Sequence, residues 1–293
     1  IDNAVDTDNL GEYNANFKRF QKHIKPGKEG FLKSAYSAYR ERSLGLGAMG
    51  FHSYLQSRRL PFEGIYATGF NHKAFKYIKG QSIKASQRLA DERGEAPDIS
   101  GSGNRNAHLL AVAPNASSSI ICGGTSPSIE PYRANVYTHK TLSGSFQVKN
   151  RHLENLLADK KLNKTELKDV WKDIAGHEGS VQHLDILTDE EKEIFKTANE
   201  IDQMWIVEHA AQRQDYICQA QSVNLFFTIP TATEKQEVHD EYMQYVNDVH
   251  WYGMNKLKSL YYFRTNAARN AENVNLKVQR IKLDDVECIA CEG

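Results

Sequence analysis

The stretch Val223-Asn224-Leu225-Phe226-Phe227-Thr228-Ile229-Pro230 has the period of a β-strand. Every second position carries a large apolar side chain, at Val223, Leu225, Phe227 and Ile229, and alternate positions of a strand point to the same face. Pro230 ends the run, because proline cannot donate a hydrogen bond to a neighbouring strand. The pattern therefore predicts a strand over residues 223–229.

A helix and a second short strand follow this segment. Apolar and aromatic residues recur at spacings of four and three, at Val238, Tyr242, Tyr245, Val249 and Tyr252, which is typical of an amphipathic helix of about six turns. A capping box of Thr233 and Gln236 is expected at its start. Leu260-Tyr261-Tyr262-Phe263 then reads as a strand. Strand, helix and strand in this order form a βαβ unit with parallel pairing, which predicts an α/β fold.

A second buried strand is predicted upstream, at Ala107-His108-Leu109-Leu110-Ala111-Val112-Ala113. It runs into Pro114-Asn115-Ala116-Ser117-Ser118-Ser119, and more small residues follow at 123–126. α/β sheets bind ligands beyond the carboxyl ends of their strands, and small residues let backbone N–H groups and hydroxyls converge on a phosphate. A Ser-rich surface turn is the alternative, since the loop has no Lys or Arg and only Arg133 lies close in sequence.

Other segments carry weaker patterns. Helices are expected over 34–60, 71–94 and 201–219, the last with Ile201, Met204, Trp205 and Glu208 on one face, and a hairpin is expected over 135–148. Charged helices are expected over 151–198, separated by a turn at 176–180.

The segment Gly45-Leu46-Gly47-Ala48-Met49-Gly50 fits the G-x-G-x-x-G pattern of dinucleotide sites. That pattern requires a buried strand before it, whereas residues 35–42 are charged and helical in character. We therefore favour glycines that allow close packing over a cofactor site.

The composition is that of an ordinary globular chain, with 293 residues, 40% hydrophobic and 25% charged. The 37 Lys and Arg balance the 37 Asp and Glu, so no net charge draws the chain to nucleic acid or to anionic membranes. Four cysteines and the lack of a signal-peptide pattern or a long apolar run favour a cytoplasmic location. Because the sequence begins at Ile1, we expect a processed or split part of a longer protein.

Tyr261 and Tyr262 are adjacent, and adjacent residues of an ideal strand point to opposite faces. Both rings could therefore come together only through a local backbone distortion. Most such pairs are packing residues, but a stacked pair could pass an electron together with a proton.

Cys288 and Cys291 lie three positions apart near the end of a polar tail. Residues 266–285 have few large apolar groups, so we expect this segment to stay mobile. About twenty such residues could reach roughly 65 Å at full extension, so the dithiol could carry reducing equivalents between separate sites. The alternatives are half of a zinc site, which lacks further ligands because Cys122 and Cys218 are isolated, or thiols without a role.

Five segments in this order resemble the carboxyl-terminal half of the large subunit of class I ribonucleotide reductase, most closely the form of T4-like bacteriophages. They are Arg105-Asn106-Ala107-His108-Leu109-Leu110, Ala113-Pro114-Asn115-Ala116-Ser117-Ser118-Ser119, Ser126-Pro127-Ser128-Ile129-Glu130-Pro131-Tyr132, Leu260-Tyr261-Tyr262-Phe263-Arg264-Thr265 and the Cys288/Cys291 tail. The resemblance covers nearly all of residues 34–293.

The resemblance implies three regions. Residues 1–33 would be a connecting segment, residues 34–265 the carboxyl-terminal half of a ten-stranded α/β barrel, and residues 266–293 a flexible redox tail. The family reduces ribonucleoside diphosphates at the 2′ carbon through a transient thiyl radical.

The resemblance also assigns roles to residues of this sequence. Pro114, Asn115, Ala116, Ser117 and Ser118 match the loop that holds the substrate diphosphate. Tyr261 and Tyr262 match the pair that relays the radical from the small subunit. Cys288 and Cys291 match the dithiol that reduces the active-site disulfide and is itself reduced by thioredoxin or glutaredoxin.

The chain departs from the family in what it lacks. No Asn-x-Cys-x-Glu segment supplies the thiyl cysteine, and Cys122 and Cys218 do not match the reducing pair. The resemblance places the nucleotide effectors in the amino-terminal half and the diferric-tyrosyl radical in the small subunit, with no cofactor or metal bound by this chain. We expect the chain to need that half as a partner and to aggregate without it. A phage-encoded chain would act in the host cytoplasm.

The sequence also allows two rival functions. The first is an inactive remnant that serves as a binding or scaffold module for the small subunit. The second is a thioredoxin-like enzyme, which would carry its CxxC at a helix start rather than on a tail.

Overall fold

Four chain segments that are far apart in sequence lie parallel in the computed structural model, which describes residues 20–27, 29–141, 144–231 and 233–266. Leu46 bridges to Leu110, and Val112 bridges to Gln221. The strand β3 (Leu225–Thr228) pairs with β4 (Phe263–Asn266). These contacts confirm the parallel pairing predicted from the βαβ pattern, with α11 (Gln236–Lys256) between the paired strands.

The strands are shorter than the sequence predicted. The apolar run at 107–113 makes only two isolated bridges, and β3 covers four residues of the predicted seven. Leu225, Phe226 and Phe227 are all buried, so this strand is covered on both faces. The Phe227 ring meets Tyr242 and Tyr245 of α11.

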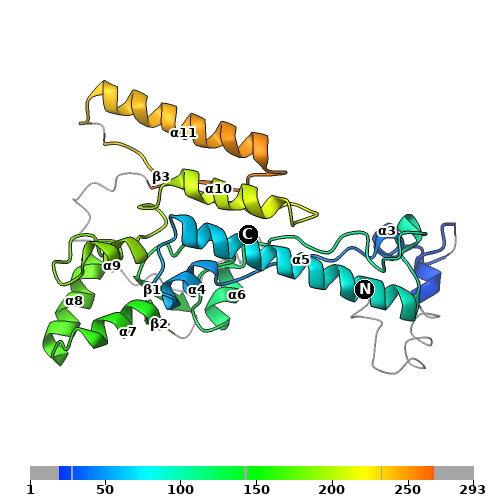
Figure 1. The fold of residues 1–293 in the computed structure, drawn as a ribbon, viewed down its shortest axis with the longest axis horizontal. Helices are drawn as coiled ribbons and strands as arrows, with labels where there is room; N and C mark the ends of the chain where they lie inside the picture. The colour runs from blue at the N-terminus through cyan, green and yellow to red at the C-terminus, as the bar shows by residue number, and fades with distance from the viewer. Residues whose placement is uncertain (1–19, 28, 142–143, 232, 267–293) are drawn as a thin grey trace, which may run out of the picture.

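Three helices form layers over the sheet, as Figure 1 shows: α5 (Ile65–Arg93), α10 (Gln203–Gln214) and α11. The middle helix, α10, contacts both neighbours. Of the residues expected on one face, Ile201 is buried and Met204 packs against the core, but the buried residues of the helix also include Ile206, Val207, Ala210 and Arg213. A helix covered on two sides has no single apolar stripe for the sequence to reveal.

The buried Arg213 is a charged residue in this core. Its guanidinium donates to Asn71 Oδ1 of α5 at 2.9 Å and to Gln221 Oε1 at 3.1 Å. It also lies over the rings of Phe51 and Phe75. A charged side chain can lie in the core when its donors are satisfied in this way.

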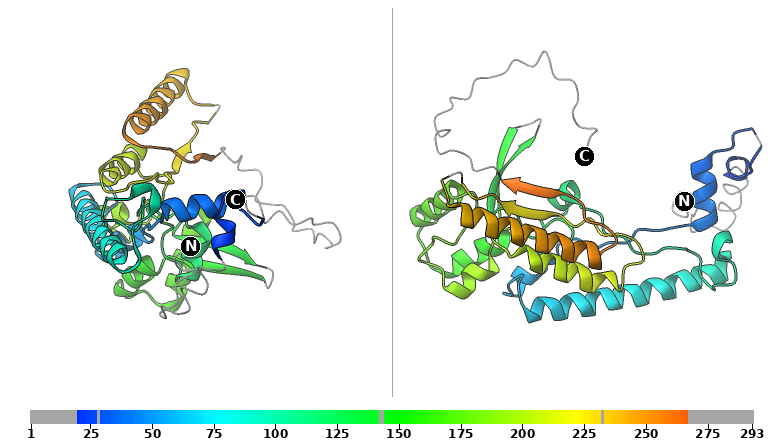
Figure 2. Two further views of the ribbon diagram at one scale, coloured as in Figure 1. Left: turned by 90° about the vertical axis from the view of Figure 1, so that its right-hand side faces the viewer. Right: turned by 90° about the horizontal axis from the view of Figure 1, so that it is seen from above.

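A second core lies under a hairpin and three shorter helices. The hairpin consists of β1 (Val136–Thr141) and β2 (Gly144–Lys149), and the helices are α7 (Arg151–Asp159), α8 (Lys164–Gly176) and α9 (Asp189–Ile194). Figure 2 shows the hairpin projecting beside the β3–β4 pair. The hairpin and the charged helices are confirmed. Capping boxes begin α8 and α9, whereas the box predicted for α11 is wrong: Lys235 is its N-cap, without a side-chain cap.

The glycine pattern at 45–50 serves packing. The helix α3 (Lys33–Glu41) precedes it, as expected, and α4 (Phe51–Ser57) follows. A Cβ atom on Gly47 would lie 2.8 Å from the carbonyl oxygen of Ala111. The missing side chain lets the 44–46 segment approach its neighbour.

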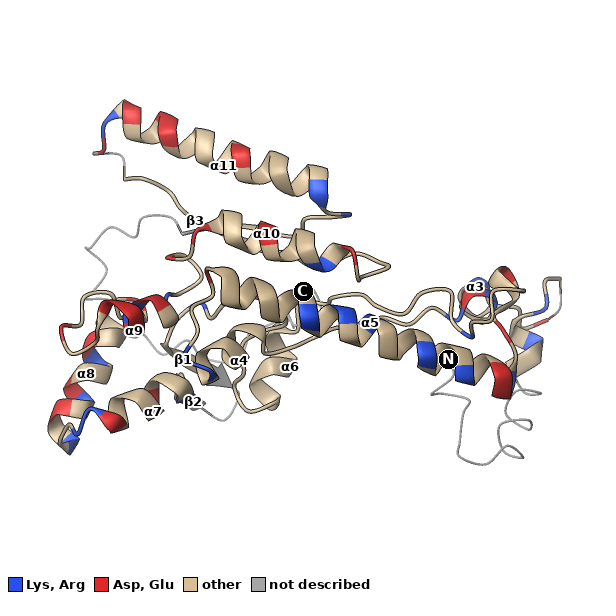
Figure 3. Ribbon diagram, viewed as in Figure 1, with Lys and Arg blue, Asp and Glu red and all other residues tan. Residues whose placement is uncertain are grey.

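The remaining described elements are two short 3-10 helices, η1 (Gln21–His23) and η2 (Pro97–Ile99), and α6 (Ala116–Ile121). Lys, Arg, Asp and Glu are spread over the helices (Figure 3). Among the described residues, no helix is long and apolar enough to cross a bilayer. Residues 1–19 and 267–293 lie outside the described part, so the three predicted regions stay predictions.

In the described part of the chain, the outer parallel segments, 44–46 and 261–266, are each paired on one side only. Leu46 at the first edge is 52% exposed, and Phe263 at the second is 47% exposed. Unpaired apolar edges of this kind favour association with further strands.

We predict opposite effects for two glycine substitutions. Gly47→Ala should lower the free energy of unfolding by about 1–3 kcal/mol, because the new methyl group meets backbone that cannot rotate away. Gly80→Ala, in the middle of α5 with no atom near its Cβ position, should raise it by about 0.5–1 kcal/mol. Thermal unfolding followed by circular dichroism measures both. Equal stability of the two variants would contradict the packing role of Gly47.

Candidate functional site

The predicted phosphate loop forms the start of α6. Asn115 precedes this helix with a positive φ of 52°, and Ala116, Ser117 and Ser118 are exposed. The first N–H groups of a helix have no partner within it. Ser119 is buried, and its hydroxyl donates to the carbonyl oxygen of Ala116 at 2.8 Å. The loop therefore offers small side chains and backbone donors to solvent.

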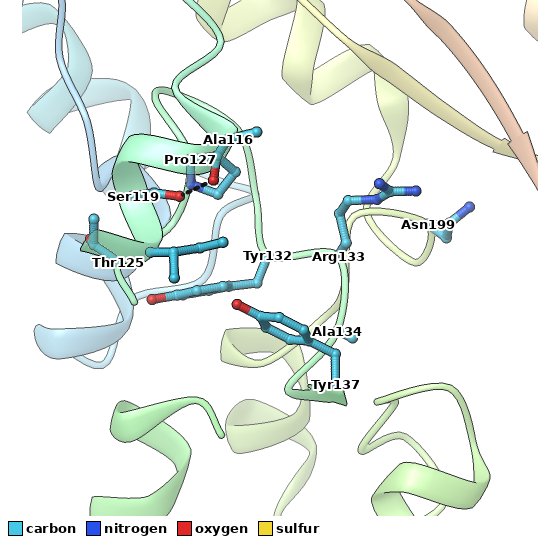
Figure 4. A pocket seen from close by; sticks show the side chains of 10 residues that line it. Ala116, Ser119, Thr125, Pro127, Tyr132, Arg133, Ala134, Tyr137 and Asn199 are labelled. Carbon is cyan, nitrogen blue, oxygen red and sulfur yellow. Dashed lines mark hydrogen bonds between the residues drawn. The ribbon is translucent and has the colours of Figure 1, made fainter. Parts of the chain in front are cut away.

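A cavity of about 410 Å³ opens beside this loop. Figure 4 shows Ala116, Ser119, Thr125 and Pro127 on one side, with Arg133 and Asn199 on the other and the Tyr132 ring between them. Of the five residues predicted for diphosphate binding, only Ala116 lines the cavity; Ser119, one residue beyond that set, also lines it.

The amino-terminal end of α4 holds the segment 126–132, which includes cavity-lining residues. The N–H of Gly50 donates to the Ser126 carbonyl oxygen at 3.0 Å, and the N–H of Ser53 donates to its hydroxyl at 3.1 Å. The N–H of Tyr132 donates to Nδ1 of His52 at 3.0 Å. Burial lowers the pKa of His52 to about 3, so this imidazole stays a neutral acceptor at physiological pH.

The two tyrosine rings lie together. The ring centroids of Tyr261 and Tyr262 are 4.2 Å apart, and the ring planes are inclined by 52°, so the pair is tilted rather than stacked in parallel. A hydrogen bond to Tyr262 raises the pKa of the Tyr261 phenol above its usual value. Both side chains are about half exposed.

A distortion of the backbone brings the rings to one side. The N–H of Tyr261 donates to the Val223 carbonyl oxygen, and the N–H of Leu225 donates to the carbonyl oxygen of Tyr262. In a regular parallel ladder, the residue whose N–H donates to Val223 would also accept the N–H of Leu225, so both bonds would involve Tyr261. Because the second bond goes to Tyr262 instead, the strand carries one extra residue. Such a β-bulge is the distortion that the sequence argument required.

A buried carboxyl group links the bulge to the cavity wall. Glu130 is 5% exposed and accepts a hydrogen bond from Nδ2 of Asn224 at 2.6 Å. The side-chain oxygen Oδ1 of Asn224 in turn accepts the N–H of Tyr262 at 3.1 Å. Burial raises the pKa of Glu130 to about 7, although Asn224, Arg264 and Arg133 oppose this shift.

Arginines lie near both ends of this link. The Arg264 guanidinium lies 5.0 Å from the Tyr262 ring centroid, and that of Arg133 lies 5.8 Å from the Phe226 ring. Desolvation lowers the pKa of Arg133 from its usual value, but the side chain is exposed and an arginine remains charged near neutral pH.

The four cysteines have different positions. Cys288 and Cys291 lie outside the described residues. Cys122 is exposed, whereas the Cys218 sulfur accepts the backbone N–H groups of Leu109 and Leu110 at 3.1 and 3.2 Å. Cys218 therefore has a structural role at the carboxyl-side end of α10.

Within the described part of the chain, one group of side chains could hold a metal ion. Ligand atoms of Asp173, His177 and His183 lie within 4.8 Å of one another. Both imidazoles are also paired with the Asp173 carboxylate, at 3.2 and 3.1 Å. These contacts to Asp173 within the group account for its geometry.

Sequence reasoning missed the link through Glu130 and Asn224. Glu130 entered only as part of a family motif, and Asn224 only as a polar residue in an alternating strand. Two features of the sequence were available as signals. Asn224 is a polar residue directly before a fully apolar run, and Glu130 is a charged residue between Ile129 and Pro131.

A model of the family described as "Ribonucleotide reductase, barrel domain" matches residues 3–102 and 96–263 of the chain. The ribonucleoside-diphosphate reductase large subunit of Invertebrate iridescent virus 3 is 41% identical over the whole chain, which covers 44% of that protein. The putative large subunit of Frog virus 3 is 43% identical over 89% of the chain and 44% of the relative.

The fold is similar to that of a solved relative. The class Id ribonucleotide reductase alpha subunit of Actinobacillus ureae matches with a TM-score of 0.69 and 37% identity, covering 91% of this chain and 48% of that one. The chain thus spans less than half the length of these three relatives. With the parallel segments and the matched barrel-domain model, the chain belongs to the ribonucleotide reductase large-subunit family and contains a carboxyl-terminal part of its barrel domain.

Proposed function

We propose that the chain is the carboxyl-terminal component of a ribonucleoside-diphosphate reductase. In this role it supplies the diphosphate loop, a radical relay through Tyr261 and Tyr262, and the shuttle dithiol Cys288/Cys291. The thiyl cysteine and the nucleotide effector sites would come from the portion that precedes this part in its relatives, on the same or another polypeptide. The radical itself would come from the diferric-tyrosyl centre of a small subunit.

The proximity of the tyrosine rings is the observation that carries this proposal. At a centroid distance of 4.2 Å the two phenols are in contact, so an electron can pass between them while each proton stays local. A packing pair would be buried, whereas these rings are half exposed at an unpaired sheet edge. That position leaves them open to both the missing barrel portion and a docked small subunit.

The exposed start of α6 supports the substrate role. Its small side chains lie beside the cavity, and Arg133 lines that cavity. Backbone N–H groups and one guanidinium suit a diphosphate, because charge-assisted hydrogen bonds to phosphate oxygens are strong. Substrate reduction would then oxidise two active-site thiols to a disulfide, and thiol–disulfide exchange would pass that disulfide to Cys288/Cys291.

We predict that Tyr262→Phe abolishes cytidine diphosphate reduction when the chain is combined with its amino-terminal portion and a radical-bearing small subunit. Phenylalanine has no hydroxyl proton to release, so it cannot take the radical. Tyr77→Phe makes the same change at an exposed tyrosine of α5 and should keep full activity. Full activity of the Tyr262 variant would exclude the relay and leave a scaffold role.

The double variant Cys288→Ser/Cys291→Ser should fail with thioredoxin or glutaredoxin as reductant. It should work slowly with a small dithiol, which can diffuse to the active-site disulfide. Cys122→Ser, at an exposed free thiol, is the control and should behave as wild type with every reductant. Normal turnover of the double variant with thioredoxin would rule out the shuttle.

Arg133→Gln should raise the KM for the diphosphate substrate by about 10- to 100-fold, which corresponds to the loss of a charge-assisted hydrogen bond of about 1.5–3 kcal/mol. Arg88→Gln, at an exposed arginine of α5, should leave KM unchanged. Steady-state kinetics at fixed small-subunit concentration tests this, and equal KM values would remove Arg133 from the substrate site.

A further inference from the structure

The bulge at Tyr261 and Tyr262 creates a donor that the sheet cannot satisfy. In the ladder between β3 and the final strand, Val223 and Leu225 bond to Tyr261 and Tyr262 on either side of the extra residue. The Tyr262 N–H has no backbone acceptor in this arrangement, and its partner is the side-chain oxygen of Asn224 at 3.1 Å. An unsatisfied donor here would cost free energy, so the Asn224 side chain stabilises the bulge.

An asparagine amide can do this only in one orientation. Its oxygen must face the Tyr262 N–H, and its NH₂ group then faces the opposite way. Nδ2 of Asn224 meets the Glu130 carboxyl oxygen at 2.6 Å. Glu130 is buried, 94 residues away in sequence, on the segment that α4 anchors. The acceptor on Glu130 therefore decides which way the Asn224 amide points.

We propose that Glu130 is a positioning residue for the tyrosine pair: through Asn224 it fixes the bulge that brings the Tyr261 and Tyr262 rings together. The function of this arrangement depends on the proposed radical relay, whereas the positioning of the rings does not. Glu130 also lies on the segment that continues into Tyr132 and Arg133 at the cavity. The same segment thus connects the substrate cavity to the relay.

The carboxyl group acts here as an acceptor toward Asn224, whether or not it carries a proton. Burial favours the neutral form and raises the pKa of Glu130 to about 7. Glutamine is close to a neutral glutamic acid in shape and keeps the acceptor oxygen. Leucine has a similar size but offers no acceptor, so the Asn224 amide would lose its orientation.

The test places 3-fluorotyrosine at position 262 of the full chain and records its ¹⁹F resonance. In the wild-type chain the neighbouring Tyr261 ring should displace this resonance from that of the free amino acid. Glu130→Gln should preserve the displacement, and Glu130→Leu should remove most of it. An unchanged resonance in a folded Glu130→Leu variant would overturn the proposal.

A donor–acceptor exchange keeps the proposal testable if the leucine variant does not fold. Asn224→Asp alone sets two carboxyl groups against each other, so the displacement should persist at pH 5.5, where they share a proton, and vanish at pH 8. In Glu130→Gln/Asn224→Asp the glutamine donates to the aspartate, and the displacement should return at both pH values. The charged groups that face Glu130, Arg133 and Arg264, do not titrate in this range. A double variant that behaves like Asn224→Asp would overturn the inference.

Turnover in the reconstituted enzyme separates this inference from the proposed function. Glu130→Leu should lower kcat more than tenfold without changing KM, and Glu130→Gln should remain close to wild type. Full activity of Tyr262→Phe would remove the relay but leave the ¹⁹F result standing. Loss of kcat in Glu130→Leu with an unchanged ¹⁹F resonance would refute the positioning role alone.

Discussion

The parallel hydrogen bonding between residues 223–228 and 261–266 is the constraint on which the candidate site depends. It places Tyr261 and Tyr262 beside Val223 and Asn224, and its one extra residue turns both rings toward one another. A parallel pair needs a long connection, which α11 provides. The rings of Phe227 and Phe263 stack 4.4 Å apart and hold the two strands in this register just after the bulge.

Buried polar groups then tie this sheet edge to the cavity beside α6. The segment from Ser126 to Tyr132 is held on one side by backbone and side-chain groups of α4, and on the other by the hydrogen bond between Glu130 and Asn224. A buried polar group costs free energy when it has no hydrogen-bond partner, and it makes the surrounding structure rigid when it has one. The cavity and the tyrosine pair are therefore connected to the same rigid segment.

The described part of the chain has open sheet edges, as part of a barrel domain would have. Its two outer parallel segments are paired on one side only, and the chain spans less than half the length of its relatives. Sheet edges with apolar side chains are stable when covered by further strands. The exposed tyrosines and Leu46 thus lie where the remainder of a barrel would join.

The sequence by itself determined the parallel βαβ unit, the hairpin, the charged helices and the adjacency of the tyrosines, because periodicity and turn chemistry act over a few residues. It did not reveal all the buried residues of α10, because a helix packed on both sides has no single stripe, and it predicted a capping box for α11 that did not form. Only the tertiary structure decided that the two rings meet, that Ser119 lines the cavity and that Glu130 accepts a hydrogen bond from Asn224. Such contacts join residues up to 94 positions apart, and they depend on how whole elements pack rather than on any local pattern.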